Sequence, residues 1–288
     1  MLSLRDLQLK RRLDALVANS DRDRIRESDP VSIVHRYGDP LDQEVVGLVA
    51  ALLAFGNISA AQRSIEFALA PLGSHPAQTL RSSELSWEKP LETFVHRIYR
   101  AEHLIHLLRS VREVLRTHGS LQALFLSHYL SRASLRDALA CFASDLRGSA
   151  DSRGIRHLLS DPGRGSACKR WMLYLRWMIR RADGVDLGIW DLPPSMLFIP
   201  VDVHVSRIAC NLGLTRRSDP SWKTSEEITT FLRTFDPNDP VKYDVAICHF
   251  GVSGKCPSRR SEPICSQCDL QSVCQQWRRS RSKKKQAR

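Results

Sequence analysis

The sequence lacks an apolar run long enough to cross a membrane. The longest such run, from Val45 to Ile58, has 14 residues and contains two glycines and an asparagine, so it suits a buried helix better. The N-terminal segment also lacks the apolar stretch of a secretory signal, because charged residues begin at Arg5. We therefore expect a cytoplasmic protein that does not bind membranes.

The sustained alternation of apolar and polar residues that is typical of strands is also missing. Instead, apolar residues recur at helical spacing along most of the 288 residues. Hydrophobic residues make up 42% of the chain and charged residues 26%, which excludes a disordered protein. The predicted fold class is all-α, with Asp42 capping the first buried helix. The expected helices are 42–53, 94–115 (as two helices), 121–129, 135–146, 169–181, 202–212, 226–235 and 243–250.

The eight cysteines do not indicate a disulfide framework, because thiols stay reduced in the cytoplasm. Four of them are scattered among apolar residues, where buried free thiols are expected: Cys141, Cys168, Cys210 and Cys248. The other four lie within 19 residues in the pattern C-x8-C-x2-C-x5-C: Cys256, Cys265, Cys268 and Cys274.

This cysteine segment predicts a metal centre. All-thiolate ligand sets suit zinc or an iron–sulfur cluster, and zinc ribbons usually carry two C-x2-C pairs. The segment has one such pair and two unequal arms, so we favour a [4Fe–4S] cluster over zinc. Four buried free cysteines are a poor alternative, because the segment is polar and basic.

Acidic residues are too few to balance the charge of the chain. There are 31 of them against 43 lysines and arginines, which gives a net charge of +12. The excess is concentrated between Lys255 and Arg288, where ten basic residues accompany only Glu262 and Asp269. A cationic surface of this kind predicts a polyanionic partner, most often nucleic acid. A solvated tail that aids solubility is the alternative.

A turn is predicted at Asp161-Pro162-Gly163-Arg164-Gly165-Ser166, directly before the helix expected at residues 169–181. Glycines allow the backbone to approach a ligand closely, and amides at the start of a helix attract an anion. We therefore expect the turn to bind an anion through Gly163, Arg164, Gly165 and Ser166.

Three segments together resemble one known family. The cysteine segment resembles the C-terminal iron–sulfur loop of endonuclease III and related adenine glycosylases, whose first arm is somewhat shorter. Residues 199–205, Ile-Pro-Val-Asp-Val-His-Val, look like the stretch that carries the catalytic aspartate in those enzymes, and residues 242–251 resemble the helix leading into the cluster loop. The order and spacing over residues 40–275 are similar to the helix-hairpin-helix base-excision DNA glycosylase superfamily, and closest to a bacterial branch without an assigned substrate.

The resemblance implies an architecture of two helical lobes with a cleft between them and a C-terminal iron–sulfur loop. The lobes would comprise residues 40–182 and residues 1–39 together with 183–277, and we expect residues 278–288 to form a disordered basic tail. The implied partner is duplex DNA, bound by a monomer in the nucleoid.

The resemblance also implies that Asp202 is the catalytic residue of a DNA repair glycosylase, which removes a damaged or mispaired base flipped from the duplex. Cleavage of an N-glycosidic bond develops positive charge on the sugar, and a carboxylate can stabilise that charge and orient or deprotonate a water. Asp202 precedes an apolar helical stripe, so it should also lie at or near a helix N-cap. Capping alone is the alternative role.

The chain departs from the family's bifunctional members at the Schiff-base lysine. They place it two residues after the second glycine of the turn, where this chain has Ala167. Lys169 lies two residues further on, about 200° away on a helix, so it does not simply substitute. We expect a monofunctional glycosylase, in which Lys169 contacts phosphate or solvent, with a nucleophilic Lys169 as the less favoured reading. A non-catalytic nucleic-acid-binding protein on the same scaffold is the alternative.

In the glycosylases that the chain resembles, this turn begins with a leucine and holds a DNA phosphate. Here Asp161 stands in place of that leucine. Two further DNA contacts are expected. His204 follows the candidate catalytic residue, in a structural or phosphate-contacting role. Asn57 follows a buried helix and either wedges into the duplex or stabilises the helix end. A cationic surface is expected from Lys169, Arg170, Arg176, Arg180 and Arg181.

Overall fold

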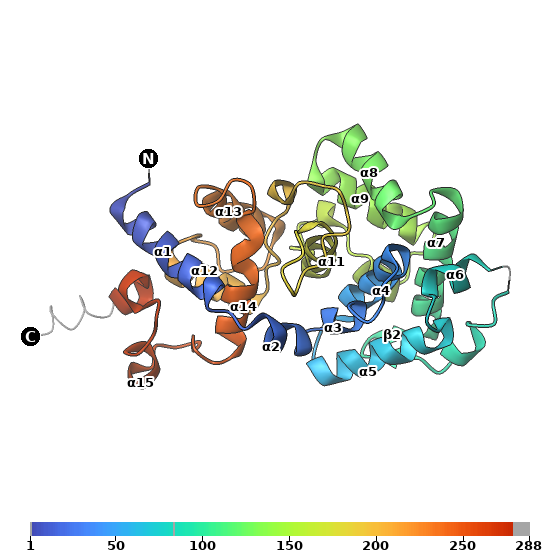
Figure 1. The fold of residues 1–288 in the computed structure, drawn as a ribbon, viewed down its shortest axis with the longest axis horizontal. Coiled ribbons are helices and arrows are strands. Elements are labelled where there is room, and N and C mark those ends of the chain that lie inside the picture. The colour runs from blue at the N-terminus through green and yellow to red at the C-terminus, as the bar shows by residue number, and fades with distance from the viewer. Residues whose placement is uncertain (1, 83, 279–288) are drawn as a thin grey trace, which may run out of the picture. The chain divides into compact units, whose positions relative to one another are not determined.

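The computed structural model describes residues 2–82 and 84–278 and confirms the all-α class (Figure 1). Among these residues the only sheet has two strands. The tail predicted at residues 278–288 lies outside the described residues except for Arg278. In the described part of the chain, no helix combines the length and apolar character needed to cross a membrane.

The chain divides into two compact units. The central unit is Arg22–Leu192, and the split unit combines Met1–Asp21 with Pro193–Arg288. The central unit contains α2 (Arg22–Glu27), α3 (Val31–Val34), α4 (Pro40–Leu53), α5 (Ile58–Leu69), α6 (Pro76–Arg81), β1 (Val95–His96), β2 (Tyr99–Arg100), α7 (Ala101–Thr117), α8 (Leu121–Arg132), α9 (Leu135–Arg147), α10 (Arg153–Leu158) and α11 (Lys169–Ile179). The split unit contains α1 (Leu4–Ala18), α12 (Val203–Leu212), α13 (Trp222–Arg233), α14 (Asp244–Val252) and α15 (Glu262–Cys265).

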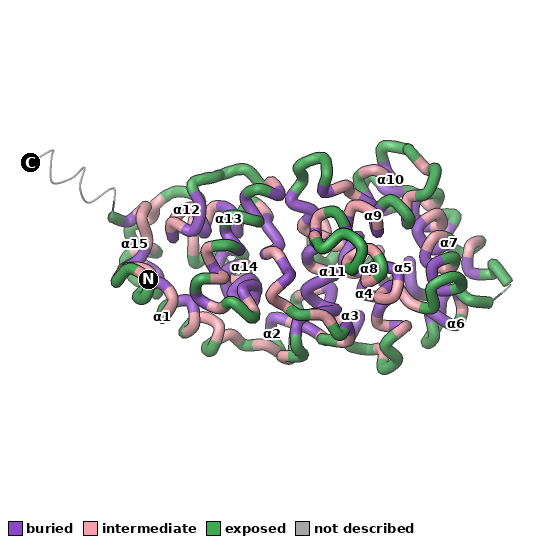
Figure 2. Tube along the Cα trace, turned by 90° about the horizontal axis from the view of Figure 1, so that it is seen from above, coloured by how far each residue is buried: buried purple, intermediate pink, exposed green. Residues whose placement is uncertain are grey.

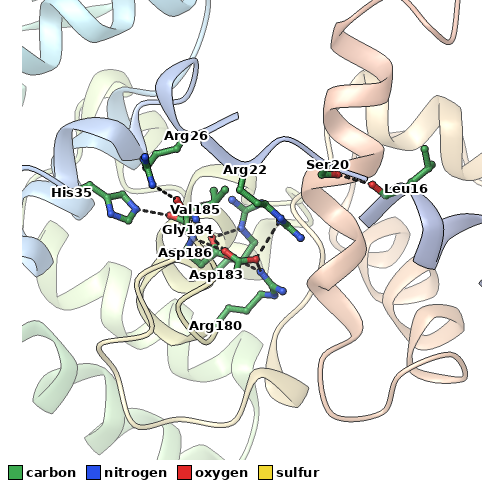
Figure 3. Close-up of polar contacts among 11 residues, drawn as sticks. Leu16, Ser20, Arg22, Arg26, His35, Arg180, Asp183, Gly184, Val185 and Asp186 are labelled. Carbon is green, nitrogen blue, oxygen red and sulfur yellow. Dashed lines mark hydrogen bonds and ion pairs between the residues drawn. The ribbon is translucent and has the colours of Figure 1, made fainter. Parts of the chain in front are cut away.

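These boundaries differ from those that we expected, because residues 22–39 and 183–192 belong to the central unit. A partly buried ion cluster explains the difference (Figure 3). Arg22 pairs with Asp183 at 3.2 Å, and Asp183 also pairs with Arg180 at 2.5 Å. Two further hydrogen bonds join the same segments, from Arg26 to the Gly184 carbonyl at 2.9 Å and from His35 Nε2 to the Val185 carbonyl at 2.8 Å.

Helix α4 is the core of the central unit and is buried on all sides over most of its length (Figure 2). Asp39 caps it, so the predicted cap at Asp42 is wrong. Asp42 lies inside the helix, and its Oδ1 accepts from the Ala77 amide of α6 at 2.8 Å. Glu44 does the same for α8, where Oε2 accepts from the Leu121 amide at 2.7 Å. Both buried carboxylates thus satisfy amides that the starts of neighbouring helices leave unpaired.

The segment 94–115 contains one long helix rather than two. A hairpin precedes α7, in which His96 pairs with Tyr99 and Val95 with Arg100. Arg97 lies at its tip with a φ of 53°, a left-handed conformation that is uncommon for residues other than glycine and asparagine. The tip has neither residue, so the sequence carries no hairpin signal.

In the split unit, α1 packs against α14 and the segment before it. The Tyr243 hydroxyl donates to Asp14 Oδ1 at 2.9 Å, and Lys242 pairs with Asp14 at 3.6 Å. Helices α12 and α14 meet closely at Gly251, where a Cβ would lie 2.9 Å from Ile208 Cδ1. The absence of a side chain at Gly251 therefore lets α14 approach α12.

Candidate active site and metal centre

Asp202 is the N-cap of α12, as the sequence predicts. Its Oδ1 accepts from the amides of His204 and Val205, both at 2.9 Å. These bonds fix the carboxylate at the positive end of the helix, where its negative charge is stabilised. Asp202 is half-buried, and the next residue, Val203, is 64% exposed. The carboxylate is thus both rigid and near solvent.

Helix α12 connects this carboxylate to the cysteine segment. Arg207 donates to the Cys256 carbonyl at 2.8 Å and to His204 Nδ1 at 3.4 Å. One turn further on, Asn211 Nδ2 donates to Cys256 Sγ at 3.7 Å. The first cysteine of the segment is therefore held by the helix that Asp202 caps.

The cysteine segment folds as short turns around partly exposed thiols. Cys265 ends α15, and the Cys268 amide donates to its carbonyl at 3.4 Å. Gln271 Nε2 donates to the same carbonyl at 3.2 Å, and the Cys274 amide donates to the Gln271 carbonyl at 3.2 Å. The two middle cysteines share one turn, as their spacing predicts.

Burial raises the pKa of the Cys268 and Cys274 thiols, and the nearby charges of other cysteines of the segment add to the effect. Backbone amides oppose it: that of Leu270 is directed at Cys268, and those of Trp277 and Gln276 at Cys274. All eight cysteines are free. Of the scattered four, Cys168 is buried as expected, whereas Cys141, Cys210 and Cys248 are only partly buried.

The donor set of the segment fits a soft metal centre. Four thiols lie near one another, and amides directed at sulfur are a recurrent feature that tunes iron–sulfur clusters. No three His, Cys, Asp or Glu side chains in residues 2–82 and 84–278 are gathered closely enough to form a ligand set. The four thiols share one neighbourhood, and their chemistry is what suits such a centre.

The turn 161–166 lies between α10 and α11, and three of its amides, those of Gly163, Arg164 and Gly165, are bonded within the turn. Asp161 Oδ1 accepts from the Gly163 amide at 2.7 Å. The Arg164 and Gly165 amides donate to the carbonyls of Asp161 and Pro162, both at 3.1 Å. Asp161 thus supplies the turn with an anion of its own. The Ser166 hydroxyl accepts from the Cys168 amide at 3.2 Å.

Lys169 is the first residue of α11 and is half-buried. Ala167 precedes the helix, and Cys168 between them has a φ of 48°. The angle of about 200° that we derived for two residues on one helix therefore does not apply. Ala167 itself is 4% exposed.

Asn57 is exposed and caps the start of α5, where its Oδ1 accepts from the Ala60 amide at 3.0 Å. It does not stabilise the end of α4, as the alternative reading proposed. The preceding Gly56 has a φ of 88°, and a Cβ there would lie 2.7 Å from Arg97 Nη1. The loop of Asn57 thus packs against the tip of the hairpin.

A family model described as "Protein of unknown function (DUF2400)" matches residues 29–253. The chain belongs to the DUF2400 family. No curated protein matches it. The DUF2400 region includes the turn, Asn57 and Asp202, and it ends three residues before Cys256. Helix α1 and the cysteine segment, which both belong to the split unit, lie outside it.

Within the DUF2400 region, one exposed surface was missed by sequence reasoning. Val95 and Ile98 of the hairpin are 60% and 46% exposed, and they flank Arg97. Ile58, beside Asn57, is also exposed. Exposed apolar residues that gather next to a cation often mark a binding surface. The adjacent apolar and basic residues in Val95-His96-Arg97-Ile98 were the available signal.

Three of the arginines expected to form a cationic surface are instead held inside the central unit of the DUF2400 protein. Arg176 and Arg180 are buried and pair with Asp186 at 3.1 and 2.7 Å. Arg170 turns inward and donates to the Leu52 carbonyl at 2.9 Å. A buried cation requires a partner, so these side chains stabilise the fold and do not contribute to a cationic surface. Arg181 is exposed.

Proposed function

We propose that this DUF2400 protein is a DNA repair glycosylase, which hydrolyses the N-glycosidic bond of a damaged or mispaired base flipped out of duplex DNA. The proposal is carried by Asp202, a half-buried carboxylate that two amides hold at the start of α12. The same helix contacts the cysteine segment through Arg207 and Asn211. The resemblance in sequence assigns catalysis to this residue.

The geometry suits the chemistry. As the glycosidic bond breaks, the sugar becomes an oxocarbenium-like cation, and a fixed carboxylate stabilises that charge without having to reorganise. The carboxylate can also orient a water or take its proton, so that the oxygen of the water attacks the sugar carbon. A rigid cap is a good position for this task, because the two amides hold Oδ1 in place.

The cofactor that we propose is a [4Fe–4S] cluster held by Cys256, Cys265, Cys268 and Cys274. The four free thiols and the amides directed at two of them support this choice. The cluster would shape the basic segment around it, where Lys255 and Arg259 are exposed.

Duplex DNA is the proposed partner, bound by a monomer in the bacterial nucleoid. Support comes from the net charge of +12 and from the exposed surface formed by Asn57, Ile58 and the hairpin tip. Unstacking a base requires a few kcal/mol, which such an apolar and cationic surface can offset by contacting the opened duplex.

We propose a monofunctional reaction without a lyase step. In the bifunctional helix-hairpin-helix glycosylases, the Schiff-base lysine occupies the position of Ala167 in this chain. Alanine has no amine, and Ala167 is also buried. Lys169 is proposed as a phosphate contact rather than as the nucleophile.

A second candidate is a non-catalytic nucleic-acid-binding protein on the same scaffold. One observation favours it. The Gly163 amide donates to Asp161, whereas in the helix-hairpin-helix glycosylases the amides of this turn hold a DNA phosphate. A chain that has lost both the lysine and this phosphate contact could have lost catalysis as well.

The two candidates are separated by Asp202→Asn. Asparagine caps a helix about as well as aspartate, so folding is preserved. Single-turnover assays would use duplexes with oxidised, alkylated or deaminated bases. For the duplex that the wild type processes, the variant should release base about a hundredfold to a thousandfold more slowly, with unchanged affinity. Elemental analysis of the same preparations should give about four iron atoms per chain and no zinc.

Asp39→Asn is the matched control, because Asp39 caps α4 through the amides of Leu41 and Asp42 at 2.9 and 3.2 Å. It should leave base release unchanged. Equal losses in both variants, or none in Asp202→Asn, would refute the role of Asp202. Tight binding without base release from any duplex would favour the non-catalytic candidate.

A further inference from the structure

One guanidinium joins three elements of the central unit. Arg170, in the first turn of α11, donates through Nη1 to the Leu52 carbonyl at 2.9 Å, near the end of α4. The same nitrogen donates to the Tyr99 hydroxyl of β2. Its other terminal nitrogen donates to the His157 carbonyl of α10. Carbonyls and a hydroxyl from distant parts of the chain thus share one planar donor.

The loop after α4 packs on this guanidinium. Phe55 lies between two cations, with Arg170 Cζ 5.4 Å and Arg97 Cζ 5.5 Å from its ring centre. The Phe55 ring also contacts His96 edge-on at 4.8 Å and Tyr99 at 5.1 Å between centroids. A cation near an aromatic ring is attracted to the ring electrostatically. Phe55 thus contacts both arginines as well as His96 and Tyr99.

The network continues from Tyr99 to His157. The Tyr99 hydroxyl is hydrogen-bonded to His157 Nδ1 at 2.7 Å. Burial lowers the pKa of His157 to about 4, and the charges of Arg170 and Arg153 add to the effect. His157 is therefore neutral at physiological pH, which lets Nδ1 accept the bond from Tyr99 while Arg170 remains the only charged member of this group of three.

We propose that Arg170 is a positioning residue, which fixes the loop 54–57 and the hairpin 95–100 as one rigid surface for nucleic acid. The inference rests on the proposed function for the identity of the ligand, and on the contacts of Arg170 for the rest. Arg170 itself is turned inward, so it acts through Phe55 and Tyr99, which belong to the same loop and hairpin as the exposed Asn57 and Ile98.

Rigidity matters at this surface because both of its parts have unusual backbones. Gly56 and Arg97 both have left-handed φ values, 88° and 53°. A non-glycine residue in this region persists only where its surroundings hold it. Arg97 contacts the Phe55 ring, and the Phe55 ring contacts Arg170. Loss of Arg170 should therefore make both the loop and the hairpin tip more mobile.

The test compares Arg170→Met, Arg170→Lys and Tyr99→Phe in the full chain. Arg147→Met is the matched control, because Arg147 is also half-buried and also donates to a carbonyl, that of Leu159, at 3.2 Å. Hydrogen exchange would be followed amide by amide. Binding to a duplex with a single mismatch would be measured at several salt concentrations.

Arg170→Met should speed exchange about tenfold or more at residues 54–57 and 95–100, with core amides of α4 unchanged, because it removes hydrogen bonds from a charged donor. Arg170→Lys should behave in the same way, since an ammonium cannot bridge three acceptors in one plane. Tyr99→Phe should give a smaller rise, and Arg147→Met none at these residues.

Duplex affinity should fall about tenfold in both Arg170 variants, with an unchanged salt slope. A lost phosphate contact would instead reduce the slope by about one and would be rescued by lysine, and that result would overturn the proposal. Unchanged exchange at both segments would overturn it as well. If the wild type binds no duplex but the exchange result holds, positioning by Arg170 stands and the proposed function falls.

Discussion

Two sets of polar residues, one in each unit, serve opposite purposes. In the central unit, Asp42 and Glu44 satisfy the starts of other helices, and Asp186 pairs with buried arginines. In the split unit, Asp202 is half-buried beside an exposed valine, and the four thiols of the cysteine segment are partly exposed. The first set of charges builds the fold of its unit, whereas Asp202 and the four thiols lie near solvent.

This difference guides the search for function. A charge that is fully consumed by neighbours stabilises structure, and its removal should lower stability. A fixed charge near solvent is free to act on a ligand, and its removal should lower activity alone. Variants of Asp186 and of Asp202 should therefore fall into these two different classes.

The largest expected effect on stability comes from Asp186→Asn. Asp186 is fully buried and pairs with Arg176 and Arg180, so the variant removes the countercharge that these two buried cations share, although Arg180 keeps its pair with Asp183. Breaking a buried pair from one side costs about 3–5 kcal/mol. Urea unfolding of the whole chain would measure the loss. As control, Asp151→Asn breaks an exposed pair with Arg156 and should cost less than about 1 kcal/mol. Equal losses would contradict the contrast.

The contributions of Glu44 and Asp14 to the pH dependence of stability should differ in sign. Burial raises the pKa of Glu44 to about 7, against the bonds from Leu121 and Trp190. Its protonated form therefore favours the folded state, and that stability is lost as the pH rises from 4.5 through 7. The slope is at most about 1.4 kcal/mol per pH unit. Urea unfolding between pH 4.5 and 8 should show this slope in the wild type and not in Glu44→Gln.

Asp14 of the split unit supplies the opposite sign. Burial raises its pKa, but hydrogen bonds from Lys10 and Tyr243 and the charges of Lys10 and Lys242 outweigh burial and lower it. Its contribution is present above pH 3.8 and is lost as the pH falls below that value. In the wild type, hydrogen exchange in α1 should become faster as the pH falls below 3.8. In Asp14→Asn this acceleration should be smaller, because the variant has no carboxylate to lose there. A parallel pH response of the two variants would contradict the contrast.

The smallest expected effect on stability is at Asn57, an exposed residue of the central unit. Asn57→Ala removes the cap of α5 and should cost about 1 kcal/mol, whereas Asn57→Gly should cost only a few tenths. If the side chain also contacts DNA, both variants should lose duplex affinity equally despite their different stability. Normal affinity in Asn57→Gly would restrict Asn57 to capping.

The sequence predicted well what depends on neighbours along the chain. The helical periodicity is confirmed, and α12 begins and ends as expected, with Asp202 as its cap and Gly213 at a φ of 74° after its last residue. Such features follow from spacing and capping, which act over a few residues.

Features that depend on distant contacts were not predictable in this way. Arg170 reads as a surface cation on an amphipathic helix, yet it donates to Leu52, which is 118 residues away. Asp42 reads as an N-cap, and it caps a different helix. The hairpin at Arg97 carries no turn residue, and only its surroundings hold it in place.

The order in which the chain leaves the ribosome follows from the divided make-up of the split unit. Its first helix contacts partners that are translated much later, since Asp14 and Tyr243 are 229 residues apart. At about 5–20 residues per second, that interval is roughly 10–45 s. The central unit can complete its core meanwhile, so α1 spends this time as a nascent helix without its native partners and is the segment most in need of protection during synthesis.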